Sequence, residues 1–159
     1  MYSNQQVAEF IKTHFVPVRV HVREQHEEFQ RLGARFSAQW TPTVLIINSD
    51  GPRGAGAPGG EIVRHRIDGF LPAEDFLTQL ILGLGHAAFA AGQFATAEER
   101  FRDVVDQHGF ADAAPEALYW AGVARYKAGG DATVLKETAD AFEKYPDSAW
   151  AKKASVWKA

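Results

Sequence analysis

An internal repetition organises the second half of the chain. Three positions recur with nearly the same residue types after 37 residues (122 − 85): Gly85, Phe89 and Gly92 are followed by Gly122, Tyr126 and Gly129. Beyond Phe76 the sequence is alanine-rich and its apolar residues follow a helical pattern. A repeat of this length is typical of helical hairpins that bury their apolar faces against one another. We therefore predict an all-α domain of helical hairpin repeats over residues 78–159.

The first half of the chain mixes helical and strand patterns. Five segments carry them: 4–15 and 24–36 with the apolar spacing of helices, and 16–22, 43–48 and 61–67 with the pattern of strands. In residues 16–22, four valines alternate with Pro17, Arg19 and His21. Residues 43–48 are apolar on both faces, which predicts an internal strand. The Gly- and Pro-rich residues 51–60 predict a loop. These patterns predict an α/β domain over residues 1–77.

Composition and charge exclude several classes of function. The chain has 159 residues, no cysteine and a formal net charge of −3. Without cysteine there are no disulfides, thiolate metal sites or thiol catalysis in this chain. The charge gives no basic surface for nucleic acid, and no apolar run reaches the roughly 20 residues that span a bilayer. Since no signal-peptide pattern is visible either, we expect a cytoplasmic protein without nucleic-acid or membrane partners.

Metal and cofactor binding are not expected from the histidine pattern. His65, His86 and His108 lie on separate predicted elements, and His21 and His26 do not have a recognised ligand spacing. No serine, histidine and acid have the spacing of a catalytic triad either. We therefore predict no catalytic residue, no metal and no cofactor.

Residues 4 to about 80 resemble the thioredoxin-like superfamily from the point after its active-site helix. The resemblance rests on the order of the elements, on the turn Thr41-Pro42-Thr43 and on the segment 67–70 before the next helix. It implies that Pro42 is a cis-proline and that Trp40, Thr41 and Pro42 bind an extended peptide or substrate. The alternative is a turn proline that only separates two elements. The Cys-x-x-Cys motif and the strand before it are missing from the match. The expected fold class is thus α/β, thioredoxin-like and incomplete at the N-terminus, followed by helical hairpin repeats.

Residues of about 78–146 resemble tetratricopeptide repeats. The first unit carries Leu84, Gly85, Gly92, Phe94, Ala97 and Phe101 at family spacing. The second unit departs from the family pattern, with Val134 and Thr138 where alanine and a large residue belong. The resemblance implies a concave face for a peptide, with these candidates: Tyr119, Arg125, Tyr126 and Lys127. The alternative is that these side chains pack the hairpins together.

Two hypotheses for the function follow. In the first, the chain is a redox-inactive module that binds a protein or peptide partner. In the second, it is the C-terminal portion of a thiol–disulfide oxidoreductase whose Cys-x-x-Cys lies upstream of Met1. If Met1 is the true start, the resemblance leaves the strands at 16–22 and 43–48 without the neighbour between them, so that they pair directly or accept a strand from another chain. We therefore expect self-association through exposed sheet edges.

Overall fold

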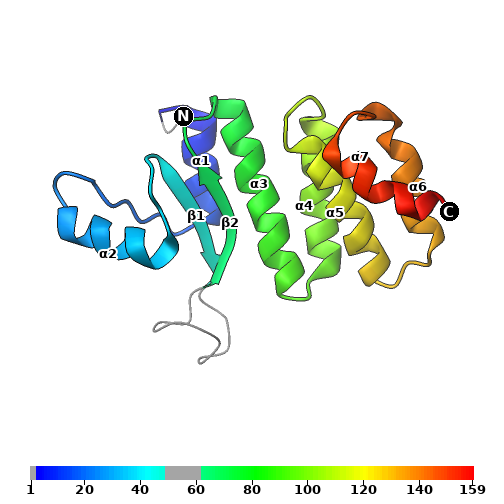
Figure 1. Cartoon of the computed structure of the whole chain (residues 1–159), viewed down its shortest axis with the longest axis horizontal. Coiled ribbons are helices and arrows are strands. Elements are labelled where there is room, and N and C mark those ends of the chain that lie inside the picture. The colour runs from blue at the N-terminus through cyan, green and yellow to red at the C-terminus, as the bar shows by residue number, and fades with distance from the viewer. Residues whose placement is uncertain (1–2, 49–61) are drawn as a thin grey trace.

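The computed structural model describes residues 3–48 and 62–159 (Figure 1). The N-terminal part contains two helices and a hairpin: α1 (Gln5–His14), α2 (His26–Phe36), β1 (Thr43–Asn48) and β2 (Ile62–Asp68). The remainder is helical: α3 (Ala73–Ala90), α4 (Phe94–Gln107), α5 (Ala114–Lys127), α6 (Thr133–Ala141), η1 (Phe142–Lys144), α7 (Ala149–Ala154) and η2 (Ser155–Lys158). The loop predicted at residues 51–60 lies outside the described residues.

The predicted α/β, thioredoxin-like fold class is wrong for this chain. The described residues form seven α-helices and one sheet of two antiparallel strands, so the protein is mostly helical. Residues 16–22 were expected to be a strand, yet none of them is paired in a sheet. A strand forms only where a neighbour accepts its backbone hydrogen bonds, and no described strand lies beside this segment.

The hairpin packs one face against α3. In the register of β1 and β2, Val44 lies opposite Ile67 and Ile46 lies opposite His65. Ile46 and Ile67 are buried in the main hydrophobic cluster together with residues of α3. Directly opposite residues of an antiparallel pair share a face of the sheet, so these four side chains form the inner face. The contact is close, because a Cβ at Gly83 of α3 would lie 2.1 Å from Cδ1 of Ile46.

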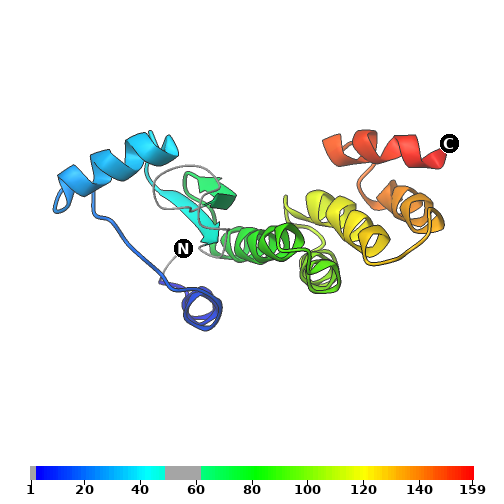
Figure 2. The same cartoon turned by 90° about the horizontal axis from the view of Figure 1, so that it is seen from below.

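The first two helices lie on opposite sides of the hairpin (Figure 2). Asn4 caps α1 by accepting a hydrogen bond from the backbone N–H of Val7, and Val7 is buried against the α3 side of the core. By contrast, α2 has no buried residue. Its C-terminal end is tied to the hairpin by Arg66, which donates to the carbonyl oxygens of Phe36 at 2.7 Å and Ser37 at 2.9 Å.

The two hairpins α3–α4 and α5–α6 confirm the 37-residue repetition. Gly92 and Gly129 end the first helix of each hairpin with φ values of +75° and +109°. The same pair of turn hydrogen bonds follows in both: Gly92 N–H to Phe89 O and Gln93 N–H to Ala88 O, then Gly129 N–H to Tyr126 O and Gly130 N–H to Arg125 O. Glycine reaches positive φ without the steric cost that a side chain would add. The repetition is therefore a repetition of structure.

Each hairpin also brings its two helices together at a glycine. A Cβ at Gly85 would lie 2.5 Å from the ring of Phe101, and one at Gly122 would lie 2.3 Å from Oγ1 of Thr138. Phe101 and Thr138 are themselves separated by the repeat length. The second unit thus uses the same contact with a smaller side chain, which accounts for its departure from the sequence pattern of the first.

A short C-terminal cap, defined here as residues 148–158, covers the end of the array. Ser148 caps α7 by accepting from the N–H of Ala151. Two tryptophans of the cap contact Tyr119 of α5, with ring centroids at 5.2 Å for Trp150 and 4.6 Å for Trp157. These contacts close the last apolar face of the helical array.

Candidate interaction surface

The turn before β1 is an exposed corner of the molecule. The Thr41–Pro42 peptide bond is cis, as predicted. The carbonyl oxygen of Pro42 accepts from the N–H of Gly69 at 2.8 Å, so the turn is joined to the end of β2. Trp40, two residues before Pro42, is 73% exposed, and Phe70, next to Gly69, is 71% exposed. We call these five residues the cis-proline corner: Trp40, Thr41, Pro42, Gly69 and Phe70.

The side chain of Thr43 holds the corner in place. Its hydroxyl donates to the carbonyl oxygen of Trp40 at 2.7 Å and lies 2.9 Å from Oδ1 of Asp68. Arg66 also binds Asp68, at 2.7 Å, and its guanidinium lowers the pKa of that carboxyl group. The carboxylate is therefore the acceptor at neutral pH, and the corner is built on a fixed polar network.

Among the described residues, one edge of β1 has no neighbouring strand. Pro42 and Gly69 lie opposite each other and are joined by a backbone hydrogen bond. Along an antiparallel pair of strands, hydrogen-bonded pairs of opposite residues alternate with pairs that are not hydrogen-bonded. In this register Val44 and Ile46 direct their backbone groups towards β2. Thr43 and Leu45 direct theirs to the opposite edge, where the described sheet has no further strand. Beside the cis-proline corner, β1 thus presents backbone donors and acceptors for another extended chain.

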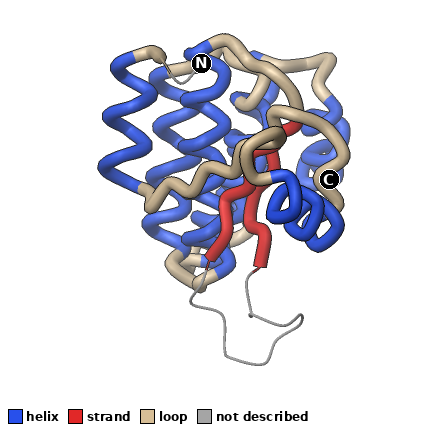
Figure 3. The backbone as a smooth tube through the Cα atoms, turned by 90° about the vertical axis from the view of Figure 1, so that its left-hand side faces the viewer, coloured by secondary structure: helices blue, strands red, loops and turns tan. Residues whose placement is uncertain are grey.

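A second extended segment is exposed between α1 and α2. Figure 3 looks onto this end of the molecule and shows the loop between the two helices in front of the strands. Val16 is 93% exposed and Val18 is 84% exposed. Within the described chain, residues 16–20 make no backbone hydrogen bond. These residues, predicted as a strand, form an exposed loop without a strand partner among the described residues.

The candidate residues of the repeat face do not share one environment. Tyr119 is half-buried and stacks on Trp157 of the C-terminal cap, so for this residue the packing alternative applies. Arg125, Tyr126 and Lys127 are exposed in the last turn of α5. Arg125 lies 3.6 Å from Glu137 of α6. Peptide binding by these three residues stays a prediction.

The structure brings together two histidines that the sequence had left apart. His65 of β2 bonds Gln79 of α3 at 2.7 Å, and its ring stacks on that of His86 at 5.7 Å. His86 in turn lies 3.1 Å from Glu116 of α5. The pKa of His65 lies below its ordinary value, chiefly because the ring is buried. The nearby His86 also lowers this pKa, whereas the hydrogen bond with Gln79 raises it.

This polar cluster joins the hairpin to the helical array. Gln79 and His86 are seven residues apart on α3, a spacing that places them on the same face of a helix. That spacing was the available signal in the sequence, but it did not show that His65 would lie opposite. Among the described residues no group of three or more His, Cys, Asp or Glu side chains has an arrangement that could hold a metal ion. The cluster is thus a half-buried junction of β2, α3 and α5.

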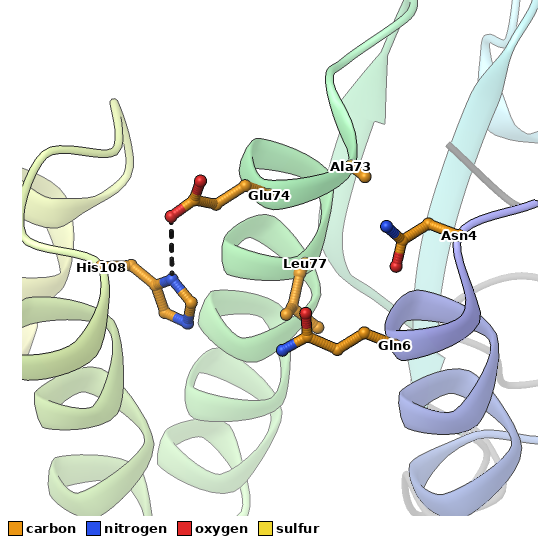
Figure 4. A pocket seen from close by; sticks show the side chains of 6 residues that line it. All are labelled: Asn4, Gln6, Ala73, Glu74, Leu77 and His108. Atoms are coloured by element: carbon orange, nitrogen blue, oxygen red, sulfur yellow. Dashed lines mark ion pairs between the residues drawn. The ribbon is translucent and has the colours of Figure 1, made fainter.

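A shallow polar pocket lies where α1, α3 and the end of α4 meet (Figure 4). It has a volume of about 380 Å³, and the described residues that line it are Asn4, Gln6, Ala73, Glu74, Leu77 and His108. Nδ1 of His108 lies 3.5 Å from Glu74, whose carboxylate is largely exposed. The ionisable side chains of this lining are the carboxylate of Glu74 and the imidazole of His108.

No helix among the described residues has the length and apolar character to cross a membrane. In comparisons with known proteins, no family model, curated protein or solved structure matches the chain.

Proposed function

We propose that the protein is an interaction module that binds an extended segment of a partner protein along the open edge of β1. One observation carries this proposal: in the described sheet the backbone groups of Thr43 and Leu45 have no partner strand, and they lie in the strand that begins at the exposed cis-proline corner. Strand addition uses such an edge, because main-chain hydrogen bonds supply affinity and side-chain contacts supply specificity.

The corner adds the apolar contacts that strand addition needs. Trp40 and Phe70 present large aromatic surfaces to solvent, and aromatic side chains are enriched among residues that dominate binding energy. Trp40, Thr41 and Pro42 are therefore proposed to bind the segment at the start of β1. The 159 residues contain no cysteine, so they supply no thiol of their own for exchange with the bound segment.

The helical array serves as the support of this surface. Helix α3 packs on both the inner face of the hairpin and α4, so the sheet edge is fixed to a rigid body. The same open edge can also pair with that of a second copy, since antiparallel pairing of two identical strands obeys two-fold symmetry. Self-association through β1 is thus the homotypic form of the same function.

The test is to select peptides from a random library on the full-length protein and to map the bound peptide by amide hydrogen exchange. The proposal predicts that the amides of Thr43 and Leu45 become protected. It also predicts that Trp40→Ala weakens the selected peptide at least tenfold, which corresponds to about 1.4 kcal/mol. The matched control is Val156→Ala, since Val156 is an exposed apolar residue of the C-terminal cap.

The result is read from the affinities of the two variants for the selected peptide. Equal loss of affinity in Trp40→Ala and Val156→Ala would contradict the proposal, as would protection confined to the helical array. Sedimentation of the free protein at increasing concentration separates the homotypic form, because a dimer formed through β1 would protect Thr43 and Leu45 without any peptide.

A further inference from the structure

The imidazole of His65 in β2 is seated on one face of α3. Gln79, Gly83 and His86 follow one another at spacings of four and three residues, which place them on the same face of the helix. Nε2 of His65 lies 2.7 Å from Oε1 of Gln79, and its ring stacks on that of His86 at 5.7 Å. Between these two contacts, a Cβ at Gly83 would lie 3.2 Å from Cδ2 of His65. The ring of His65 thus packs directly on the backbone of α3.

This seat favours a neutral imidazole. Burial is the main cause that lowers the pKa of His65, and the hydrogen bond with Gln79 opposes it. His86 lowers this pKa as well, whereas Glu116 of α5 raises it. However, the carboxylate of Glu116 lies 3.1 Å from Nε2 of His86, and within the described chain no carboxylate forms an ion pair with His65. The other charged residues of the packed elements are Glu74 and Asp75 in the first turn of α3 and Arg64, Arg66 and Asp68 of β2, whereas β1 is uncharged.

The hairpin is attached to the helical array through this same face. Among the described helices, α3 is the one on which both β1 and β2 pack, and the contacts of α3 with α4 and of α4 with α5 do not involve the hairpin. Helix α2 has no buried residue, and Arg66 ties its end to the hairpin. Proteins open in units of this kind, with opening free energies below that of global unfolding. The hairpin is therefore a unit that can leave α3 while the array keeps its own contacts.

We propose that His65 is a proton-sensitive latch between the hairpin and α3, whose protonation favours an open state in which β1 and β2 leave α3 while the helical array stays folded. In the open state the charged ring regains water, and the inner face of the hairpin loses its cover. Because β1 belongs to the unit that leaves, its edge is no longer fixed to a rigid body. The inference goes beyond the proposed function and does not depend on it, since it concerns the free protein.

The sign and the size of the effect follow from proton linkage. The closed state resists protonation of His65, so the open state binds the proton first as pH falls below the ordinary histidine pKa of about 6.5. Above that pH both states are neutral and the latch stays closed. For one imidazole, the open population then rises by at most about tenfold between pH 7.5 and pH 5.5. We expect a rise between about threefold and this limit.

The test is amide hydrogen exchange of the full-length protein by NMR at pH 7.5 and pH 5.5, with each rate divided by the unstructured rate at the same pH. The amides of Val44 and Ile46, which are directed to β2, should open with one common free energy. The amides in the interiors of α4 and α5 should be protected more strongly. Acidification should raise the opening of Val44 and Ile46 by the expected factor. Equal protection of the hairpin and the array would show that the hairpin does not leave on its own, and would overturn the proposal.

Two histidine variants assign the pH dependence. His65→Gln keeps a polar side chain at the seat but takes up no proton, so the opening of Val44 and Ile46 should no longer depend on pH. The matched control is His108→Gln, because His108 lies 3.5 Å from Glu74 and joins α4 to α3 inside the array. This control should keep the full dependence. A dependence that persists in His65→Gln, or that disappears in His108→Gln, would overturn the proposal.

An NMR titration of the His65 ring in the unmodified protein tests the latch without any variant. Its midpoint should lie below the value of about 6.5 for an ordinary histidine. A midpoint at or above that value would overturn the proposal, because the closed state would then not resist the proton. All these measurements use the free protein, so their failure leaves the proposed binding at β1 standing, and a failure of peptides to bind at β1 leaves the latch standing.

Discussion

The hairpin part of the molecule and the helical array use their apolar residues differently. Of the buried apolar side chains in the described residues, three precede residue 73, namely Val7, Ile46 and Ile67, and all others lie in α3 or beyond. The helical part buries most of its apolar residues, and Phe110 and Val156 are exposed exceptions. The hairpin part buries one face against α3 and leaves valines, Trp40 and Phe70 in solvent. The array is therefore the stable support, and the hairpin part is the surface that is open to a partner.

Helix α3 explains why the two parts form one structure. Its buried residues lie on more than one face, and they join Val7, Ile46 and Ile67 in a single cluster with Phe101 and Val104 of α4. It runs without a break from Ala73 to Ala90, across the boundary at residues 77 and 78 that the sequence suggested. The hairpin thus depends on the array for its inner face, while the array depends much less on the hairpin.

The largest expected effect distinguishes a phenylalanine of the array from one of α2. Phe101 is fully buried, so Phe101→Ala should lower the free energy of unfolding by about 3–5 kcal/mol. Phe29 of α2 is only half-buried, and Phe29→Ala should cost less than about 1 kcal/mol, well below the value for a core site. Urea denaturation followed by far-UV circular dichroism measures both. Similar losses in the two variants would contradict the comparison.

An intermediate effect is expected at the contacts within the two hairpins. Gly85→Ala would drive a methyl group into the buried ring of Phe101, and overpacking of this kind costs about 1–3 kcal/mol. Gly122→Ala would meet Thr138 still more closely, with its Cβ only 2.8 Å away, and should cost at least as much, because a Cβ cannot move without its backbone. Thermal unfolding of the two variants compares the two hairpins. A clearly smaller loss at Gly122 than at Gly85 would contradict this expectation.

The smallest effect is a dependence of stability on pH at the junction of the two parts. His65 has a pKa below its ordinary value, chiefly because it is buried, so the folded protein resists its protonation. The unfolded chain takes up the proton first as pH falls below about 6.5, and stability declines through that window by at most about 1.4 kcal/mol per pH unit. His65→Gln should reduce this decline between pH 7.5 and pH 5.5.

Control variants at the junction exclude the neighbouring groups as the cause. His86 stacks on His65, and Glu116 lies on the other side of His86. His86→Gln and Glu116→Gln therefore need the same urea titrations. If the decline persists in His65→Gln but disappears in His86→Gln, the titrating group is His86 and the assignment to His65 is wrong.

The sequence allowed the helical repeats to be predicted because their signal is local. Gly92 and Gly129 mark the ends of equivalent helices, and each repeat buries its own contacts. The prediction of a strand at residues 16–22 also used a local pattern, the alternation of apolar residues, and it was wrong. A strand depends on a neighbour distant in sequence, and the pattern of valines carries no information about whether that neighbour is present.

The candidate surface was foreseen in part. The cis bond at Pro42 was expected from the resemblance, and the structure confirms it. The contact between His65 and His86 could not be predicted, because it joins a strand and a helix whose packing is set by the whole core. Tyr119 was a candidate of the binding face or of the packing between hairpins; in the structure it is half-buried and its ring contacts Trp150 and Trp157 of the C-terminal cap.

Residue-resolved amide hydrogen exchange of the free protein tests the central claim most directly. The account predicts slow exchange in the interiors of α4 and α5 and at Val44 and Ile46, whose N–H groups point to β2. It predicts exchange close to the unstructured rate at the amides of Val18, Thr43 and Leu45. Protection of these three amides as strong as that of Val44 would show that the edges are already paired, and would contradict the account.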